Sequence, residues 1–125
     1  MSEARCELRE GDAIYKKLHV WQRSMELVKV VYGLMKKFPR SENFRLCDQL
    51  SRAVISIPSN IAEGNGRCSK KEFIHFLSIA RGSLYETMTQ LEIATDLGYI
   101  DDSEIPVELA STVRRMLNSL ISKLS

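Results

Sequence analysis

The sequence has few of the residues that break helices, with three prolines and six glycines among 125 residues. Its three cysteines can form one disulfide bridge at most, so a disulfide-built scaffold is excluded and a reducing cytoplasm is the expected compartment. No apolar run approaches the ~18 residues of a membrane-spanning helix. The polar N-terminus also lacks the apolar stretch of a secretory signal. These absences indicate a cytoplasmic, helical protein with no membrane partner.

Recognisable sets of catalytic or metal-ligating residues are also missing. The two histidines, His19 and His75, stand in no H-E-x-x-H pattern, and the cysteines have no C-x-x-C spacing that would hold zinc. The string Glu63–Arg67 contains two glycines but matches neither a dinucleotide-binding fingerprint nor a P-loop. We therefore expect no metal, no cofactor and no enzymatic activity.

Charge is distributed unevenly along the chain. Residues 1–12 carry two basic and four acidic residues, residues 13–81 carry thirteen and five, and residues 82–125 carry three and seven. The net charges of these segments are −2, +8 and −4, within a total of +2. This asymmetry favours either an anionic partner for the middle of the chain or contact between oppositely charged protomers. Solvated helix faces are the plain alternative.

Hydrophobic periodicity predicts four helices and no strands. Apolar residues recur at three- and four-residue steps over about residues 18–38, 42–63, 69–98 and 103–124. Short connections between them predict one all-α domain, an antiparallel up-down-up-down four-helix bundle over residues 13–125, behind a flexible acidic arm of residues 1–12. The residues expected to be substantially buried are Trp21, Leu50, Ile57, Leu77, Leu84, Leu91, Leu109 and Leu120.

The expected helix ends coincide with proline, glycine and a capping pattern. Pro39 closes the first helix, and Gly98 closes the third. Ser69 and Glu72 fit a capping box at the start of the third helix, in which each side chain bonds the other residue's backbone N–H. Gly82, inside the third helix, either allows a close helix crossing or is simply tolerated.

Pro58 falls inside the second helical pattern. A proline there removes one backbone hydrogen bond and crowds the carbonyl one turn earlier, but the apolar stripe continues in phase, so we expect one kinked helix. Polar residues beside the kink are expected to bond groups freed at the bend or cations nearby, or to contact a partner. The residues assigned to this structural motif are Pro58, Ser59, Asn60, Glu63 and Gly64.

Basic residues surround the predicted start of the third helix, where unpaired N–H groups and the helix dipole already favour an anion. Arg67, Lys70 and Lys71 would meet a phosphate there together with the Ser69 hydroxyl. Arg52 and Arg45 lie about two turns apart on the second helix and would extend a basic track along it. The alternative is that Ser69 only caps the helix and the bases are solvated.

The apolar stripe of the first helix is wide and contains nine of the large apolar residues from Trp21 to Phe38. One narrow seam of a bundle requires fewer. This width predicts that the chain associates with further copies of itself.

Three strings carry a family resemblance: Ser56–Arg67, which contains Ile-Pro-Ser-Asn-Ile-Ala-Glu-Gly, then Ser69–Phe73 and Phe76–Leu84. They resemble the four-helix-bundle proteins encoded in intervening sequences of bacterial 23S ribosomal RNA genes, over about residues 14–124. The resemblance implies a ring-like homopentamer with no known enzymatic activity. More distantly, the chain is similar to the accessory proteins of diversity-generating retroelements, which are basic pentameric bundles that bind nucleic acid and a reverse transcriptase.

Two functional hypotheses follow. The first is a non-catalytic, oligomeric protein associated with nucleic acid, and specifically with RNA, through its basic middle segment. The alternative is a structural or protein–protein scaffold without nucleic-acid binding. The nearly neutral total charge sets this chain apart from the basic retroelement proteins, so RNA binding is expected to be weak and tolerant of sequence.

Overall fold

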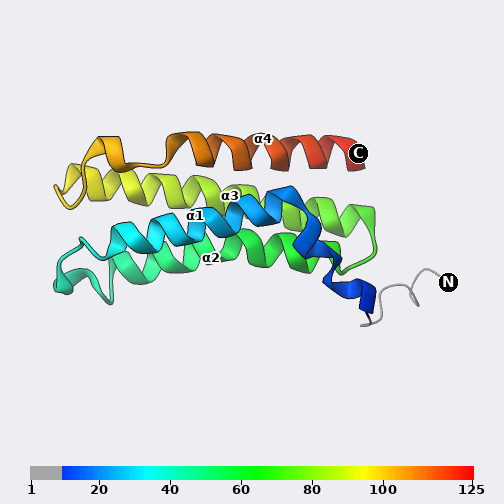
Figure 1. Ribbon diagram of the computed structural model, residues 1–125, viewed down its shortest axis with the longest axis horizontal. Helices are drawn as coiled ribbons and strands as arrows, with labels where there is room; N and C mark the ends of the chain where they lie inside the picture. The colour runs from blue at the N-terminus through cyan, green and yellow to red at the C-terminus, as the bar shows by residue number, and fades with distance from the viewer. Residues whose placement is uncertain (1–9) are drawn as a thin grey trace.

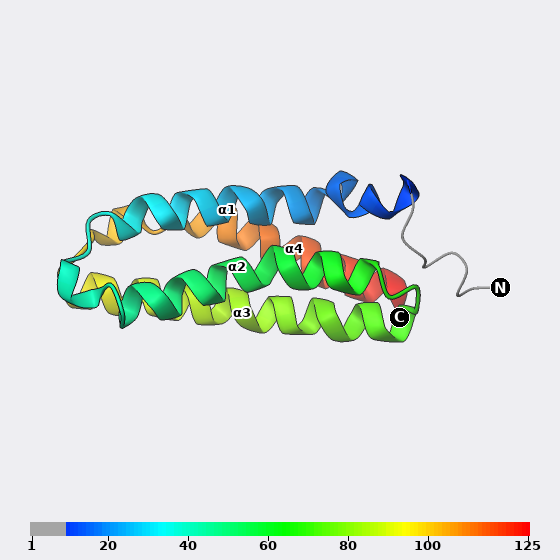
Figure 2. The same cartoon turned by 90° about the horizontal axis from the view of Figure 1, so that it is seen from below.

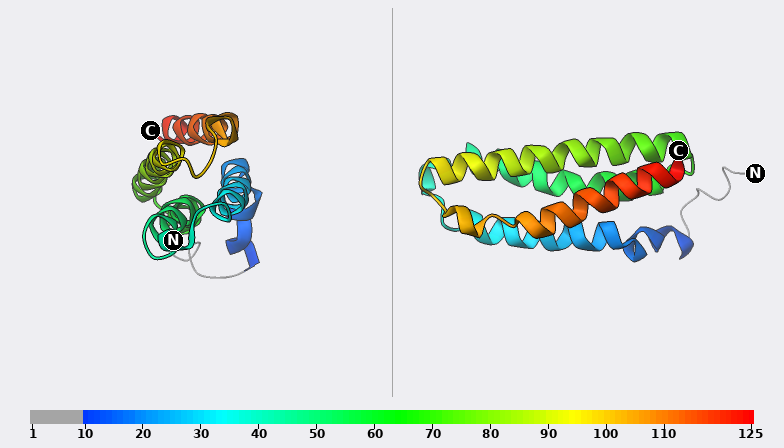
Figure 3. Two further views of the ribbon diagram at one scale, coloured as in Figure 1. Left: turned by 90° about the vertical axis from the view of Figure 1, so that its left-hand side faces the viewer. Right: turned by 90° about the horizontal axis from the view of Figure 1, so that it is seen from above.

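Four α-helices run antiparallel in the computed structural model, which describes residues 10–125 (Figure 1). They are α1 (His19–Met35), α2 (Leu46–Asn65), α3 (Lys70–Asp96) and α4 (Val107–Leu124). Each helix packs against the next one along the chain, and α1 also packs against α4, which closes the bundle (Figure 2, Figure 3). The up-down-up-down order and the lack of strands among the described residues confirm the predicted fold class.

A 3-10 helix, η2 (Glu10–Lys17), leads into α1. Residues 10–12 of the expected acidic arm belong to this helix, and residues 1–9 lie outside the described residues. None of the helices in the described part of the chain has both the length and the hydropathy that crossing a bilayer requires.

One buried row of aliphatic side chains from each helix forms the core. The largest fully buried aliphatic side chains are Leu27, Val31, Leu50, Val54, Ile57, Ile61, Leu77, Leu84, Leu91, Val113 and Leu117. Five of the eight residues predicted to be buried are in this set. The prediction was less accurate for Trp21, Leu109 and Leu120, which are half-buried and pack against the edge of the core. These three lie at the margins of apolar stripes that are wider than the helix–helix contact, so the contact covers them only in part.

The wide apolar stripe of α1 divides between two surfaces. Leu27, Val31 and Leu34 point into the core and are buried, whereas Met25 and Tyr32 are exposed on the neighbouring face. The first helix therefore does carry more apolar side chains than the core of the bundle buries, and some of them are exposed on its surface.

The α1–α2 connection is longer than predicted. α1 ends at Met35, before Phe38, and α2 begins at Leu46 because residues 40–42 form a separate 3-10 helix, η3 (Arg40–Glu42). The carboxylate of Glu42 accepts a hydrogen bond from the Leu46 N–H at 3.3 Å and so supports the start of α2.

α4 also starts later than predicted, at Val107 and not near Ser103. Ile105 precedes Pro106 and has an extended backbone (φ −66°, ψ 126°), since a residue before proline is driven out of the helical region. Pro106 is therefore the residue before the helix and not part of its first turn. Residues 102–104 form a short 3-10 helix, η4 (Asp102–Glu104), with its own capping box.

Both ends of α3 agree with the sequence. Ser69 is its N-cap, and its last turn closes at Gly98, whose φ of +82° favours glycine. The Tyr99 N–H donates to the Ala94 carbonyl at 2.9 Å, and the Gly98 N–H donates to the Thr95 carbonyl at 3.0 Å. These two bonds form a Schellman motif, which satisfies carbonyls at the end of the helix.

Two polar contacts join the α1–α2 connection to the α3–α4 connection at one end of the bundle. The Tyr99 hydroxyl donates to Glu42 Oε2 at 2.6 Å, and Lys37 forms an ion pair with Glu104. The Tyr99 ring also packs on Phe38, with 5.5 Å between ring centroids. The hydrogen bond from Tyr99 holds the pKa of the Glu42 carboxyl below its usual value.

We expect the substitution Tyr99→Phe to lower the melting temperature at pH 7 and to have little effect near pH ~3. The pKa of Glu42 is lower in the folded state than in the unfolded chain, so its contribution to stability is present above the unfolded pKa and is lost as pH falls through the folded value. Thermal unfolding at both pH values measures this difference. An equal loss at both would show that Tyr99 acts through packing on Phe38 and not through Glu42.

Candidate nucleic-acid interface

A close approach between α2 and α3 positions the predicted anion site. A Cβ atom on Gly64 would lie 2.7 Å from Phe76 Cβ and 3.0 Å from Phe73 Cδ1, so only glycine allows the end of α2 to lie this close to the start of α3. The chain then turns at Cys68, which has a φ of +58°. This crossing brings Glu63 and Arg67 beside the first turns of α3.

Arg67 is held between two carboxylates and an aromatic ring. Its Nη2 lies 3.0 Å from Glu63 Oε2, and its Nη1 lies 3.4 Å from Glu72 Oε1. The guanidinium carbon is 5.0 Å from the centroid of the Phe76 ring, which adds a cation–π contact. An anion at Arg67 would compete with both carboxylates, so Arg67 is a weaker anion ligand than its sequence context indicates.

Only half of the predicted capping box at Ser69 forms. The Ser69 Oγ accepts a hydrogen bond from the Glu72 N–H at 3.3 Å, as predicted. The reciprocal bond was wrongly predicted, because the Glu72 carboxylate turns to the guanidinium of Arg67. The exposed side chains of Lys70 and Lys71 remain beside the first turn of α3, and neither is in an ion pair with a described carboxylate.

A shallow hollow of about 560 Å³ lies beside this helix start. The residues around it are Arg67, Ser69, Lys71, Glu72, His75 and Phe76. His75 stacks edge-on against Phe76 with 5.5 Å between ring centroids. The hollow therefore combines cations, a hydroxyl and aromatic edges with one carboxylate, a mixture that accommodates a phosphate better than an apolar ligand.

Arg45 and Arg52 do not join this site. Arg45 is the residue before α2, at the opposite end of a helix of 20 residues, or roughly 30 Å from Arg67. Arg52 forms an ion pair with Asp48 at 3.2 Å, and this pair interrupts the expected basic track along α2. Of the six residues nominated from the sequence, four therefore lie together at the start of α3, and Arg45 and Arg52 lie apart from them.

A polar network near Pro58 joins α2 to α3. α2 continues through the buried Pro58 as one helix, and its ribbon changes direction near the middle (Figure 2). Asn60 Nδ2 donates to the carbonyl and to the Oγ of Ser56, both at 2.8 Å, and Ser56 Oγ lies 2.8 Å from Ser83 Oγ on α3. This network links α2 to α3.

The carbonyl that Pro58 deprives of its helical partner is that of Val54. Among the described residues, neither Asn60 nor Glu63 bonds it, and the carbonyl that Asn60 does bond is that of Ser56, two residues before Pro58. Glu63 instead bonds Arg67, the cation that the sequence also indicated, and Ser59 is exposed.

The described residues contain no group of three or more His, Cys, Asp or Glu side chains placed to hold a metal ion. Cys47 is half-buried against the core. Burial, and then the negative charge of Glu42, raise the pKa of the Cys47 thiol, so the reactive thiolate is disfavoured.

Sequence reasoning nominated Arg45 but missed Arg40 and Phe44, which with Arg45 form a second basic surface at the α1–α2 connection. Arg40 and Arg45 are exposed there on either side of Phe44, whose side chain is 95% exposed. A signal for it exists in the sequence, since Phe44 falls outside the apolar stripe that begins at Leu46.

Comparison with known proteins supports the family resemblance that the residues around Pro58 carry. No curated protein matches the chain significantly. Residues 16–119, which include all of α1, α2 and α3 and most of α4, match the family described as 23S rRNA-intervening sequence protein. The chain therefore belongs to the 23S rRNA-intervening sequence protein family.

Proposed function

We propose that this protein is a non-catalytic, self-associating protein that binds RNA through the basic surface of its middle segment. The observation that carries the proposal is the number of exposed cations without a carboxylate partner. Eight cations between residues 16 and 71 are exposed and form no ion pair in the described part of the chain: Lys16, Lys17, Lys29, Lys36, Arg40, Arg45, Lys70 and Lys71.

Cations of this kind favour a polyanion. Each phosphate they neutralise releases condensed counterions, which supplies affinity without reading sequence. The family description, which refers to 23S rRNA, supports RNA as the polyanion. Four basic residues of the same segment, Arg23, Lys37, Arg52 and Arg67, are already paired with carboxylates, so the expected affinity is modest.

The double variant Lys70→Ala/Lys71→Ala should weaken RNA binding and reduce the salt dependence of the affinity. Each lost phosphate contact lowers the slope of log K against log salt by about 0.7 for single strands. Fluorescence anisotropy with a labelled RNA 20-mer across a salt series measures both quantities.

The matched control is Arg114→Ala/Arg115→Ala, which removes the same charge from α4 in the acidic C-terminal segment. It should change the affinity much less than the lysine pair does. If both double variants bind RNA as the parent does, the start of α3 is only a capped helix end.

The proposed self-association uses a groove between α1 and α2. Apolar side chains of both helices, among them Trp21, Met25, Val28, Ile55 and Pro58, line a hollow of about 320 Å³, and Met25 and Ile55 are exposed. Exposed apolar surface of this kind marks an interaction site. The pentameric number is implied by the family resemblance alone.

Light scattering after size exclusion should therefore show a species well above 14.3 kDa. A strictly monomeric protein at high micromolar concentration would contradict self-association. Self-association without any RNA binding would favour the scaffold hypothesis instead.

A further inference from the structure

Phe44 is exposed to a degree that no other large apolar side chain in residues 14–125 approaches. Its side chain is 95% exposed, whereas the other exposed large apolar residues reach 60% at most. Those residues lie mainly on the sides of helices. Phe44 lies in the connection between η3 and α2, so its aromatic ring is open to solvent and available to a partner.

The turn that carries Phe44 is held in place by contacts that do not involve the phenyl ring. The Asn43 N–H donates to the Arg40 carbonyl at 3.0 Å, and the Arg45 N–H donates to the Glu42 carbonyl at 3.0 Å. The Glu42 side chain is bound on two sides, by the Tyr99 hydroxyl and by the Leu46 N–H. The ring is therefore presented by an ordered backbone, which reduces the conformational entropy that a partner must remove.

The surroundings of Phe44 favour nucleic acid over protein. Its neighbours in the chain are polar, and Arg40 and Arg45 are exposed cations that form no ion pair in the described part of the chain. The charge of Arg45 also contributes to lowering the pKa of the Glu42 carboxyl in the same turn. Aromatic and arginine side chains also occur in protein–protein interfaces, but there they anchor a closely packed and largely apolar patch. A single exposed aromatic ring with arginines before and after it in the same turn is instead the combination that binds single-stranded nucleic acid, where bases stack and phosphates meet cations.

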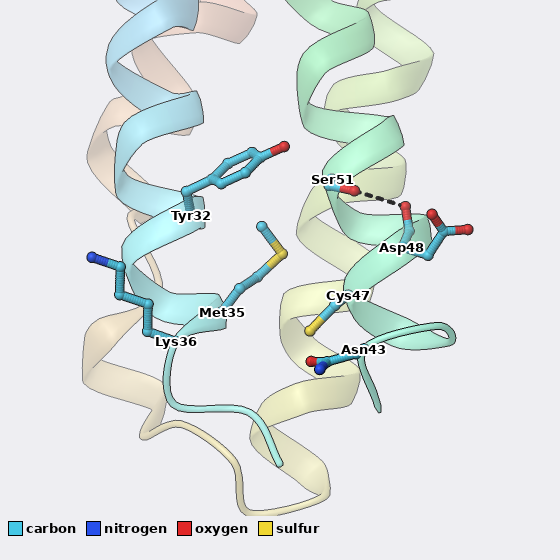
Figure 4. Close-up of a pocket in the computed structure, with 7 residues that line it drawn as sticks. All are labelled: Tyr32, Met35, Lys36, Asn43, Cys47, Asp48 and Ser51. Carbon is cyan, nitrogen blue, oxygen red and sulfur yellow. Dashed lines mark hydrogen bonds between the residues drawn. The ribbon is translucent and has the colours of Figure 1, made fainter. Parts of the chain in front are cut away.

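We propose that Phe44 is a stacking platform for an unpaired base of single-stranded RNA, with Arg40 and Arg45 on the adjoining phosphates. This inference rests on the proposed RNA association and adds that the recognised RNA contains unpaired bases. A hollow of about 370 Å³ next to the turn gives the strand room to continue (Figure 4). Tyr32 and Met35 point into it from α1, and Asn43 and Cys47 border it from the other side.

The test compares Phe44→Leu with Phe44→Tyr in the full chain. The probes are a labelled oligouridine 20-mer and a 20-base-pair RNA duplex, each measured by fluorescence anisotropy across a salt series. Phe44→Leu should weaken binding of oligouridine by about 5- to 150-fold, which corresponds to the loss of one stacked base. Phe44→Tyr should keep the parent affinity, and neither variant should change duplex binding.

Two further readouts separate stacking from other roles. Phe44→Leu should leave the slope of log K against log salt unchanged because no charge is removed, whereas Arg45→Ala should reduce that slope by about 0.7. The control Tyr85→Leu removes another exposed aromatic ring, from α3, and should have no effect on RNA binding. All variants should keep the parent's far-ultraviolet spectrum and elution volume.

The outcomes are distinguishable. If the parent binds RNA and Phe44→Leu binds oligouridine equally well, the stacking inference is wrong and RNA association stands. If Phe44→Leu binds RNA as the parent does but elutes as a smaller species, Phe44 contacts a second copy of the chain, which also overturns the inference. If the parent binds neither RNA probe, RNA association itself fails and the stacking inference fails with it.

Discussion

Leu50→Ala should lower the free energy of unfolding by about 2–5 kcal/mol. Leu50 is completely buried between the helices, so its truncation removes transfer free energy and leaves a cavity that the other helices fill only partly. Urea unfolding followed by circular dichroism gives the value. Parent and variant are compared at one protein concentration, because self-association adds to apparent stability.

Leu120→Ala is the matched control for this measurement. The sequence predicts the same burial for both leucines, but Leu120 is half-buried at the edge of the core. Its truncation should cost clearly less than that of Leu50. Equal losses would show that the side of α4 bearing Leu120 is covered in solution, as an interface between copies would cover it.

Gly64→Ala should destabilise the protein by about 1–3 kcal/mol, although alanine is the better helix former. The new methyl group would lie 2.7 Å from Phe76 Cβ, an atom fixed to the backbone of α3, so the two helices must move apart. The movement would also separate Glu63 and Arg67 from the start of α3. Thermal and urea unfolding measure the loss.

Gly82→Ala should change the stability of the protein in the opposite direction. Nothing lies within 4 Å of a Cβ atom added at Gly82, which is exposed in the middle of α3. The substitution should therefore stabilise the helix by about 0.5–1 kcal/mol. The close helix crossing that the sequence allowed at Gly82 is found at Gly64, and a gain in stability from Gly64→Ala would contradict this assignment.

The four helices could be predicted because each carries an apolar stripe of helical period over many turns. Ser69 and Gly98 marked the ends of α3 correctly, since the N-cap and the left-handed glycine depend only on local backbone geometry. The starts of α2 and α4 were placed too early. Short 3-10 helices before them have the same apolar spacing over a few residues, and periodicity does not separate the two kinds of helix.

The candidate site was harder to predict because its charges choose among several partners within reach. Glu72 has Ser69 three residues away in sequence, yet its carboxylate bonds Arg67, which Glu63 also bonds. Sequence spacing identifies such partners but not the choice between them. Phe44 was missed for a related reason, since the turn that carries it is held by the bond between Glu42 and Tyr99, which lie far apart in the sequence.

The salt dependence of RNA affinity for the unmodified full chain tests the central claim most directly. Binding of the labelled RNA 20-mer is measured from about 50 to 200 mM salt. If exposed cations of the middle segment bind phosphates, log K falls linearly with log salt, with a slope of about −0.7 for each phosphate contacted. An affinity that does not change with salt, or no binding at about 50 mM salt, would contradict RNA association through this basic surface.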